Sequence, residues 1–432
     1  MHKVLKTVVD LFRRRNDDLI TFDQDRYTRS INLKRHCFGE FSMANAQANA
    51  IMEDQSQVEV ASQYALYLGV YDGHGGVEAS LYVLNNLFNN LLRFAHENDD
   101  PIADILRNAV ADTENGFLDY VENNIGLIRT IGKVGSCCLA GVLWNGVLYI
   151  ANLGDSRAVI GSVVNKRVSA VQLTTDHNCN DPVIREELIS LHPGDPTIVM
   201  EQNGWRVKGI SMVSRSIGDA YLKRPQFLLP TYEEVPHPFD RGVLSAEPEM
   251  LTRVIEATDK FLIFASDGLW ELMTNDEAVQ IVHKNPRKGI AKRLVTTALV
   301  EAARRRGITY RAMKTATPGK ETCVGRRTFH DDISVIVVFL DNKTPLFKKH
   351  LLDLSYRGST NGSQPSAFAL SGLTATESHS FTGDLKKSFI KRFKGSTSKG
   401  RSSQTEHLRH LYMGRIDSDE SSQTESSVNS TG

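Results

Sequence analysis

The stretch GSCCLAGVLWNGVLYIANLGD, residues 135–155, contains two apolar runs separated by Asn145-Gly146. An Asn-Gly pair between two such runs is the strongest short-range signal for a β-hairpin. The hairpin requires antiparallel neighbours, whereas several other apolar runs of this chain have the pattern of strands buried on both faces. Two antiparallel sheets stacked as a β-sandwich, with helices packed outside, satisfy both conditions. The sequence therefore predicts an α+β fold with four layers, α-β-β-α.

Comparable runs lie on both sides of this hairpin. YALYLGVY comes directly before Asp72, KFLIFAS comes directly before Asp267, and ISVIVVFL begins just after Asp331-Asp332. A further run, RAVIGSVV, follows the hairpin after a tight turn at Asp155. Apolar residues at helical spacing predict helices over 77–94, 103–123, 182–191, 275–283 and 287–305.

The composition divides the chain of 432 residues into three parts. Residues 1–37 form a polar, weakly patterned head that is expected to be partly disordered or amphipathic. An amphipathic helix is expected in its first residues, MHKVLKTVVDLFRRRNDD, and such a helix would either dock on the protein or lie on an anionic membrane surface. Residues 38–342 are predicted to form one catalytic domain. Residues 343–432 are rich in Ser and Thr, and we expect a disordered tail because such a stretch buries too little apolar surface to offset its ordering entropy.

The overall composition argues against several classes of protein. The formal net charge is zero, which disfavours a surface built to attract nucleic acid. No apolar run approaches the ~20 residues that a membrane span requires, and the N-terminus is too interrupted for a secretory signal. The cysteines are odd in number and lack CxxC spacing, which disfavours a disulfide framework or a zinc ribbon and favours a reducing compartment. They are Cys37, Cys137, Cys138, Cys179 and Cys323.

Acidic residues recur where the apolar runs end. Asp72, Asp155, Asp267 and Asp331 share this position, and Glu53-Asp54 precedes another strand-like run. A single Asp-Gly pair is usually only a turn, because Asp bonds its own backbone and Gly accepts positive φ. Strand ends of one sandwich can converge at one rim, however, and several carboxylates there would repel one another. Mg²⁺ or Mn²⁺ would relieve that repulsion, since both ions prefer oxygen ligands.

The turn GVYDGHGG, residues 69–76, places a glycine and a histidine directly after one of these acids. Gly73 has no Cβ, so its backbone can approach a metal ion closely. A histidine in a turn is more often structural, bonding a neighbouring carbonyl. His74 can instead face the leaving group of a reaction at the metal ions.

Six motifs then occur in an order that resembles one family, the metal-dependent type 2C Ser/Thr protein phosphatases. The resemblance covers about 38–340, and the family's β-sandwich flanked by helices agrees with the predicted architecture. The motifs are MED at 52–54, YDGHGG at 71–76, ANLGDSRAV at 151–159, SRSIGD at 214–219, ASDGLWE at 265–271 and HDDIS at 330–334.

The resemblance implies a role for each acid. Asp72 would bridge two Mn²⁺ or Mg²⁺ ions, and Asp54 would hold a metal-bound water by a hydrogen bond. The other implied metal ligands are Glu53 and the Gly73 carbonyl for one ion, Asp267 and Asp331 for the second, and Asp155 for a third, weaker ion. A metal-bridging hydroxide would attack phosphoserine or phosphothreonine directly, and His74 would act as the general acid. The implied enzyme is a monomeric protein-serine/threonine phosphatase.

The sequence departs from the family at one position of the site. Members usually have an arginine four residues before the metal-binding glutamate, where it clamps the substrate phosphate, and this chain has Asn49. Asparagine offers no bidentate charged clamp. Asp332 stands where the family often has Asn. The stretch 203–219 resembles the family's mobile flap, in which Arg215 and Asp219 are expected to be structural.

Details of the motifs most resemble the plant D-type subgroup. That resemblance implies phosphoprotein substrates, among them the phosphothreonine tail of the plasma-membrane proton pump, and inhibition by small auxin-induced proteins. We expect a cytoplasmic protein, peripheral at the plasma membrane or nuclear, without nucleic-acid partners. LKKSFIKRFKG, residues 385–395, is either a solvated charge cluster, a membrane contact or a nuclear-import signal.

Two other functions are compatible with parts of the pattern. A catalytically weak phosphatase-like scaffold that binds phosphoproteins is favoured by Asn49 alone, and the complete set of acids argues against it. A metal nuclease would use the same metal chemistry. It would also need a groove of basic and aromatic residues, which the core sequence does not contain.

Overall fold

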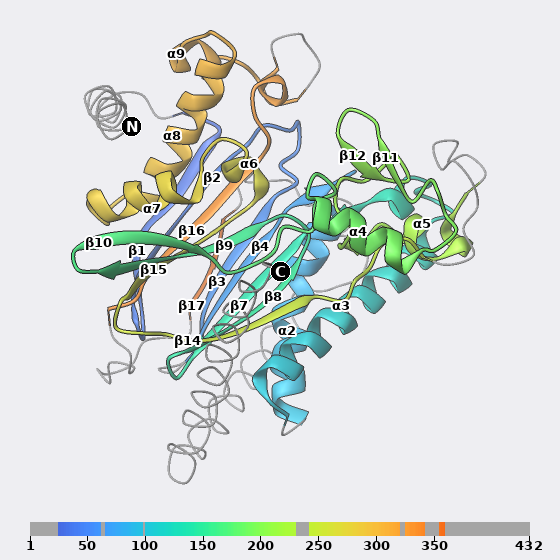
Figure 1. Cartoon of the computed structure of the whole chain (residues 1–432), viewed down its shortest axis with the longest axis horizontal. Coiled ribbons are helices and arrows are strands. Elements are labelled where there is room, and N and C mark those ends of the chain that lie inside the picture. Colours follow the sequence, from blue (N-terminus) through green and yellow to red (C-terminus); the bar gives the residue numbers. More distant parts are fainter. Residues whose placement is uncertain are drawn as a thin grey trace, which may run out of the picture.

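The computed structural model describes residues 25–61, 65–97, 100–229, 242–319, 325–341 and 354–358. Within these ranges, two six-stranded sheets stack against each other and helices cover both outer faces (Figure 1). The predicted α-β-β-α layering is confirmed. The first sheet has the order β1 (Thr28–His36), β2 (Gly39–Ala46), β16 (Ile333–Phe339), β15 (Asp259–Ala265), β9 (Arg157–Val164) and β10 (Arg167–Gln172).

The second sheet contains the hairpin that the sequence predicted. Its order is β14 (Glu249–Val254), β8 (Val147–Leu153), β7 (Cys138–Trp144), β4 (Ala65–Tyr71), β3 (Gln55–Ala61) and β17 (Leu354–Arg357), with antiparallel pairing throughout. The turn residues Asn145 and Gly146 have φ of 49° and 80°, the positive values that a type I′ turn requires. The local Asn-Gly signal and the tertiary pairing therefore agree.

Smaller elements lie beside the two sheets. A three-stranded sheet joins β13 (Ile217–Gly218), β6 (Gly135–Ser136) and β5 (Gly73–His74), and a hairpin joins β11 (Val199–Glu201) to β12 (Trp205–Val207). The short helices are α4 (Pro182–Leu191), α5 (Ala220–Lys223), α6 (Asp267–Trp270) and α9 (Tyr310–Met313), with 3-10 turns η1 (Ile131–Lys133), η2 (Pro225–Phe227) and η3 (Arg326–Thr328).

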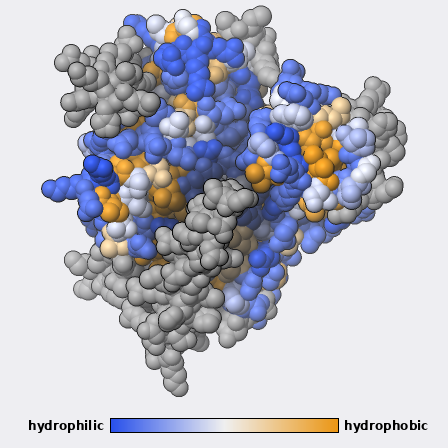
Figure 2. Space-filling model, viewed as in Figure 1, coloured by the Kyte–Doolittle hydropathy of each residue, from blue (hydrophilic) through white to orange (hydrophobic). Residues whose placement is uncertain are grey.

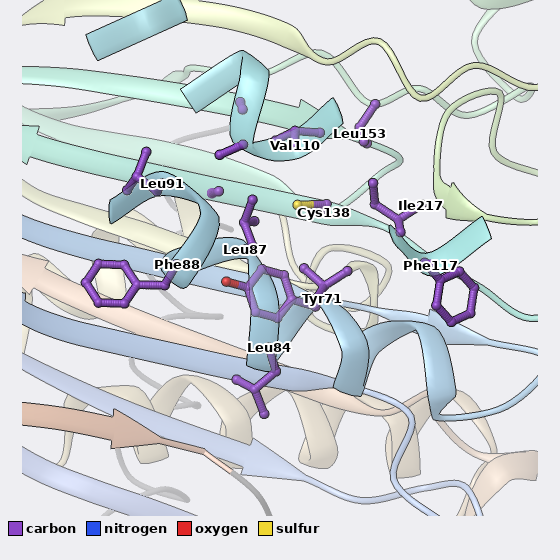
Figure 3. Packing of buried hydrophobic residues seen from close by; sticks show 14 of the residues in the cluster. Tyr71, Leu84, Leu87, Phe88, Leu91, Val110, Phe117, Cys138, Leu153 and Ile217 are labelled. Atoms are coloured by element: carbon purple, nitrogen blue, oxygen red, sulfur yellow. The ribbon is translucent and has the colours of Figure 1, made fainter. Parts of the chain in front are cut away.

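The long helices cover the sheets because each has one apolar face. α2 (Glu78–Glu97) and α3 (Ile102–Asn124) pack on the second sheet, where Leu84 and Leu87 lie beside Tyr71 (Figure 3). α7 (Asn275–Lys284) and α8 (Ile290–Arg305) cover the first sheet. The five predicted helices are thus present, with ends that differ by a few residues.

A third apolar cluster fills the space between the two sheets. Leu66 and Leu68 of β4 belong to it, together with Phe264 of β15 and Ile336 of β16, and none of these side chains is exposed. Burial of one such side chain stabilises the fold by roughly 1.5–3 kcal/mol. The cluster thereby holds the ends of β4, β15 and β16 at fixed positions, and the site described below lies at those ends.

The predicted domain limits differ from the strands at both ends. β1 begins at Thr28, ahead of the predicted start at residue 38, and β17 lies beyond the predicted end at 342. The stretch expected to be a disordered tail from residue 343 thus includes one strand, which pairs with β3. The amphipathic stretch of the head up to residue 24, Cys323 and the basic cluster 385–395 lie outside the described residues. In the part of the chain that the structure describes, no helix is long and apolar enough to cross a membrane.

Candidate metal centre

The acids that the sequence singled out come from both sheets and meet at one rim. Asp72 follows β4 and Asp155 follows β8, both in the second sheet. In the first sheet, Asp267 opens α6 directly after β15, and Asp331 precedes the adjacent β16. Strands that alternate in direction bring these ends to the same side of the sandwich. Asp72 and Asp155 offer ligand atoms that lie, together with the Cys137 thiol, within 4.8 Å of one another.

The carboxyl groups perturb one another strongly. The pKa of Asp72 is raised well above its ordinary value, first because water is excluded and then because Asp267, Asp54 and other acids lie nearby. Exclusion of water and the charges of Asp155 and Asp331 raise the pKa of Asp267 in the same way, although a hydrogen bond with Asp72 partly opposes this. The pKa of Glu53 rises to about 7, mainly through burial and through Asp332. A cluster of this kind favours a bound cation.

The donor set fits a hard divalent cation. Asp267 Oδ1 is buried and has no hydrogen-bond partner in the described part of the chain. A buried carboxylate oxygen without a partner is costly unless a cation or a water satisfies it. The neighbouring ligand atoms are mainly carboxylate oxygens, which Mg²⁺ and Mn²⁺ prefer. The residues present therefore suit the metal ions that the sequence predicted.

Gly73 lies where its backbone is pressed against the loop that carries Glu53. A Cβ on Gly73 would come 2.7 Å from the carbonyl oxygen of Glu53 and 2.8 Å from Ser80 Oγ. The Ser80 hydroxyl, on α2, donates to that same Glu53 carbonyl at 2.5 Å. Any larger residue at 73 would push the Asp72 turn and the Glu53 loop apart, so the glycine is required for their close approach.

Asp54 is buried under the acids and is held by hydroxyl groups. The Ser266 hydroxyl donates to Asp54 Oδ2 at 2.7 Å, and the Ser266 oxygen in turn accepts the Ser334 N–H at 2.9 Å. Burial and the nearby Asp332 raise the pKa of Asp54, while the hydrogen bond from Ser266 lowers it. The serines that follow β15 and begin β16 thus orient this carboxyl.

Asp332 organises the loop that bears Glu53. Its Oδ1 accepts the backbone N–H of Ala48 at 2.6 Å and of Asn49 at 3.0 Å, and its Oδ2 accepts the N–H of Glu53 at 2.7 Å. The Asn49 side-chain amide donates to Asp332 Oδ2 and to Glu53 Oε2, both at 3.2 Å. The sequence placed Asp332 only as a neighbour of Asp331. Its position directly before β16 did not indicate that its carboxylate bonds the backbone of Ala48, Asn49 and Glu53, which lie near the other end of the domain in sequence.

His74 is paired with an acid that the sequence analysis expected to be structural. His74 Nε2 lies 2.8 Å from Asp219 Oδ2, which also accepts from the Ser216 hydroxyl at 2.6 Å. Burial lowers the pKa of His74, but the charge and hydrogen bond of Asp219 outweigh it and the pKa is raised overall. Gly135 leaves room for the pair, since a Cβ there would lie 2.3 Å from Asp219 Oδ2 and 2.4 Å from His74 Nε2.

Three further side chains lie at the rim that the sequence did not single out as site residues. Cys137 Sγ donates to Asp155 Oδ1 at 3.3 Å, and the Asn178 amide donates to the other oxygen, Oδ2, at 2.7 Å. Arg327 Nη2 pairs with Asp331 Oδ2 at 2.5 Å. Cys137 belongs to the apolar run 135–144, and Arg327 lies four residues before Asp331. An i,i+4 ion pair was the one sequence signal that pointed to the arginine.

The stretch 203–219, interpreted from the sequence as a flap, lies in a small satellite cluster beside the rim. β12 packs with α4 and α5 around Cys179, Ile184 and Val207. Figure 2 shows hydrophobic surface over α4, where Val183, Ile189 and Leu191 are exposed. The Arg215 guanidinium donates to Glu187 Oε1 at 2.8 Å and so ties this stretch to α4, as a structural residue does. Asp219, by contrast, contacts His74 at the site itself.

Known proteins resemble this chain over most of its length. Residues 34–311 match the family described as Protein phosphatase 2C. The chain is 48% identical to the probable protein phosphatase 2C 43 of Oryza sativa subsp. japonica, over 83% of this chain and 91% of that protein. It is 49% identical to the probable protein phosphatase 2C 68 of Arabidopsis thaliana, over 79% and 88%. The solved serine-threonine phosphatase 2C from Toxoplasma gondii shares the fold, with a TM-score of 0.53 at 18% identity over 72% of this chain and 98% of that one.

Proposed function

This chain belongs to the protein phosphatase 2C family and is a protein-serine/threonine phosphatase, and we propose that it hydrolyses phosphoserine and phosphothreonine by direct attack of an activated water, without a phosphoenzyme. The observation that carries this mechanism is the meeting of acids from both sheets beside a histidine that is paired with Asp219. The family is metal-dependent. We propose two ions, Mn²⁺ or Mg²⁺, and a weaker third.

Each acid has a proposed role that its surroundings support. Two divalent ions bound at this rim would neutralise the phosphate and activate the attacking water. The ligands proposed for them are Asp72 for both, Glu53 and the Gly73 carbonyl for one, Asp267 and Asp331 for the other, and Asp155 for the third. Asp54, oriented by Ser266, would accept a hydrogen bond from a water at the site.

His74 would protonate the leaving oxygen. A serine or threonine alkoxide is a poor leaving group, and general-acid catalysis is typically worth ~10²–10⁴ in rate. Because Nε2 bonds Asp219, Nδ1 is the ring nitrogen that remains for the substrate. Asp219 also favours the protonated ring that an acid requires. His74 is therefore the proposed catalytic acid, and Asp219 the residue that positions it.

The deciding experiment is an assay with phosphothreonine peptides. The protein is expected to release phosphate with Mn²⁺ or Mg²⁺ and to lose this activity in EDTA. Asp72→Asn and Asp267→Asn should each abolish turnover while the circular dichroism spectrum is unchanged. Full activity of Asp72→Asn would refute its role as a shared ligand. Peptide binding without hydrolysis in any metal would favour the catalytically weak scaffold instead.

We further propose a setting for the enzyme on the basis of its resemblance in sequence to the plant D-type subgroup. Phosphothreonine in the tail of the plasma-membrane proton pump is the proposed substrate, and small auxin-induced proteins are the proposed inhibitors. The basic cluster at 385–395 would hold the cytoplasmic enzyme at the membrane surface, since each basic residue near an anionic leaflet contributes ~1 kcal/mol.

Sedimentation with phosphatidylserine vesicles tests the membrane contact. The whole chain is compared with a variant in which the lysines and arginine of 385–395 are replaced by glutamine. Equal sedimentation of the two proteins at physiological salt would exclude this cluster as the anchor, and nuclear accumulation that is lost in the variant would favour an import signal.

A further inference from the structure

A phosphate monoester carries two negative charges, and the rim that receives it is crowded with acids. Besides the metal ions, a basic side chain facing this rim would favour the substrate. Burial raises the pKa of Glu53, and the charges of His74 and Arg327 oppose this rise; Arg327 also reaches the acids directly, with Nη2 2.5 Å from Asp331 Oδ2. His74 bonds Asp219 through Nε2, and its other ring nitrogen is already proposed to face the leaving oxygen. Arg327 is therefore the candidate for binding the phosphoryl group.

The guanidinium of Arg327 is directed at the acids and keeps free donors. Its charge interacts with Asp331, Asp332 and Asp267, which together raise its pKa against the opposing effect of burial. In the described part of the chain its one ion pair is with Asp331, through Nη2, and its side chain is 31% exposed. Nε and Nη1 thus remain for an oxyanion, and a guanidinium presents its donors in the planar fork that suits phosphate.

The neighbouring arginine fixes the segment that presents Arg327. Arg326 is completely buried, and its two terminal nitrogens each lie 2.9 Å from a carboxylate oxygen of Asp25. Its guanidinium also lies over the ring of Tyr27, 5.2 Å from the centroid. This bidentate contact holds η3 against the start of the described chain. Consecutive arginines therefore point to opposite sides, one into the core and the other to the rim.

Asn49 does not compete for this role. Both contacts of its amide are within the protein, to Glu53 and Asp332, so its donors hold the Glu53 loop. Asp331 is itself a proposed metal ligand, and a cation on its carboxylate would weaken its hold on Arg327. The guanidinium would then turn toward a substrate on the same ions.

We propose that Arg327 binds the phosphoryl oxygens of the substrate and sets its position at the metal centre. The inference rests on the proposed phosphatase mechanism and adds a residue to it. Loss of the guanidinium should weaken substrate binding more than turnover, because a contact made both before and in the transition state acts mainly on KM. Arg327→Lys should retain part of the effect, since a lysine keeps the charge but not the fork.

The test compares Arg327→Met and Arg327→Lys with Arg306→Met, a control at an exposed arginine at the end of α8. For Arg327→Met we expect KM for a phosphothreonine peptide to rise about tenfold, which is ~1.4 kcal/mol, while kcat changes less. Calorimetry should show a similar loss of affinity for inorganic phosphate in the Mg²⁺-loaded Arg327→Met protein. The phosphate affinity of Arg327→Lys should lie between those of the wild type and Arg327→Met. The control should match wild type.

Calorimetric titration with Mg²⁺ alone separates this role from a structural one. If Arg327→Met changes only the affinity for Mg²⁺ and leaves phosphate affinity and KM at wild-type values, Arg327 is merely the partner of Asp331 and the inference is overturned. Absence of peptide hydrolysis by the wild-type protein would contradict the proposed function instead, and the phosphate calorimetry would still decide the role of Arg327.

Discussion

His74 and Asp219 are 145 residues apart in the chain, yet Nε2 of the histidine lies 2.8 Å from Oδ2 of the aspartate. The contact joins the turn after β4 to the residue after β13, which has left-handed backbone geometry with φ of 48°. Asp219 is buried, and its own pKa is lowered because His74, Ser216 and Lys223 outweigh the effect of burial. It therefore remains charged and acts on the histidine.

Removal of the Asp219 charge should change the pH dependence of catalysis. A general acid must be protonated, so activity falls as pH rises through the pKa of His74. Since Asp219 raises that pKa, Asp219→Asn should move the alkaline limb of kcat to lower pH for a phosphothreonine peptide. The profile with p-nitrophenyl phosphate, whose leaving group needs no proton, is the control. An unmoved alkaline limb would contradict the proposed pairing in catalysis.

Substitution of His74 should affect substrates according to their leaving groups. His74→Ala is expected to lower kcat for a phosphothreonine peptide by ~10²-fold or more, the usual size of general-acid catalysis, and to change p-nitrophenyl phosphate hydrolysis little. Steady-state kinetics on both substrates at saturating Mn²⁺ measure the difference. An equal loss on both would assign His74 a structural role.

A methyl group at residue 135 should separate His74 from Asp219 while both side chains keep their chemical identity. The Cβ of Gly135→Ala would lie 2.3 Å and 2.4 Å from the two bonded atoms, too close for the contact to persist. The variant should therefore resemble His74→Ala in its substrate dependence. Gly126→Ala is the matched control, because a Cβ there meets nothing within 4 Å. Wild-type peptide turnover in Gly135→Ala would show that the pair is dispensable.

The stability gained from metal binding should increase with pH. Without metal, the raised pKa of Glu53, about 7 against an ordinary 4.5, means that the folded state holds this proton more tightly than the unfolded state. Stability present at low pH is therefore lost as pH rises from the ordinary value through about 7. The raised pKa values of Asp72 and Asp267 act in the same direction.

A divalent cation replaces these protons, so the difference in unfolding temperature between Mn²⁺ and EDTA should grow from about pH 5.5 to about pH 7.5, a range that spans the raised pKa of Glu53, about 7. Differential scanning fluorimetry measures it, and Asp267→Asn should show a much smaller difference throughout. A difference that does not depend on pH would mean that the metal does not displace these protons.

Local features of the sequence determined the elements and the resemblance that identified the family. Short-range backbone preferences and hydropathy are enough to predict the Asn145-Gly146 turn and the apolar runs with acids at their ends. Each of these features depends only on neighbours within a few residues. The strands outside the predicted limits were missed for the same reason. β1 and β17 have little apolar signal of their own, and their pairing with β2 and β3 places them in the sheets.

Tertiary structure alone decided which groups act on each other at the rim. Asp219 and Asp332 could be named from the motifs, but their hydrogen bonds to His74 and to the Glu53 loop join segments far apart in the chain. Arg326 and Arg327 are identical in type and adjacent in sequence, yet one is buried on Asp25 and the other faces the acids. Side-chain direction and burial depend on how distant strands pack, and no local pattern contains that information.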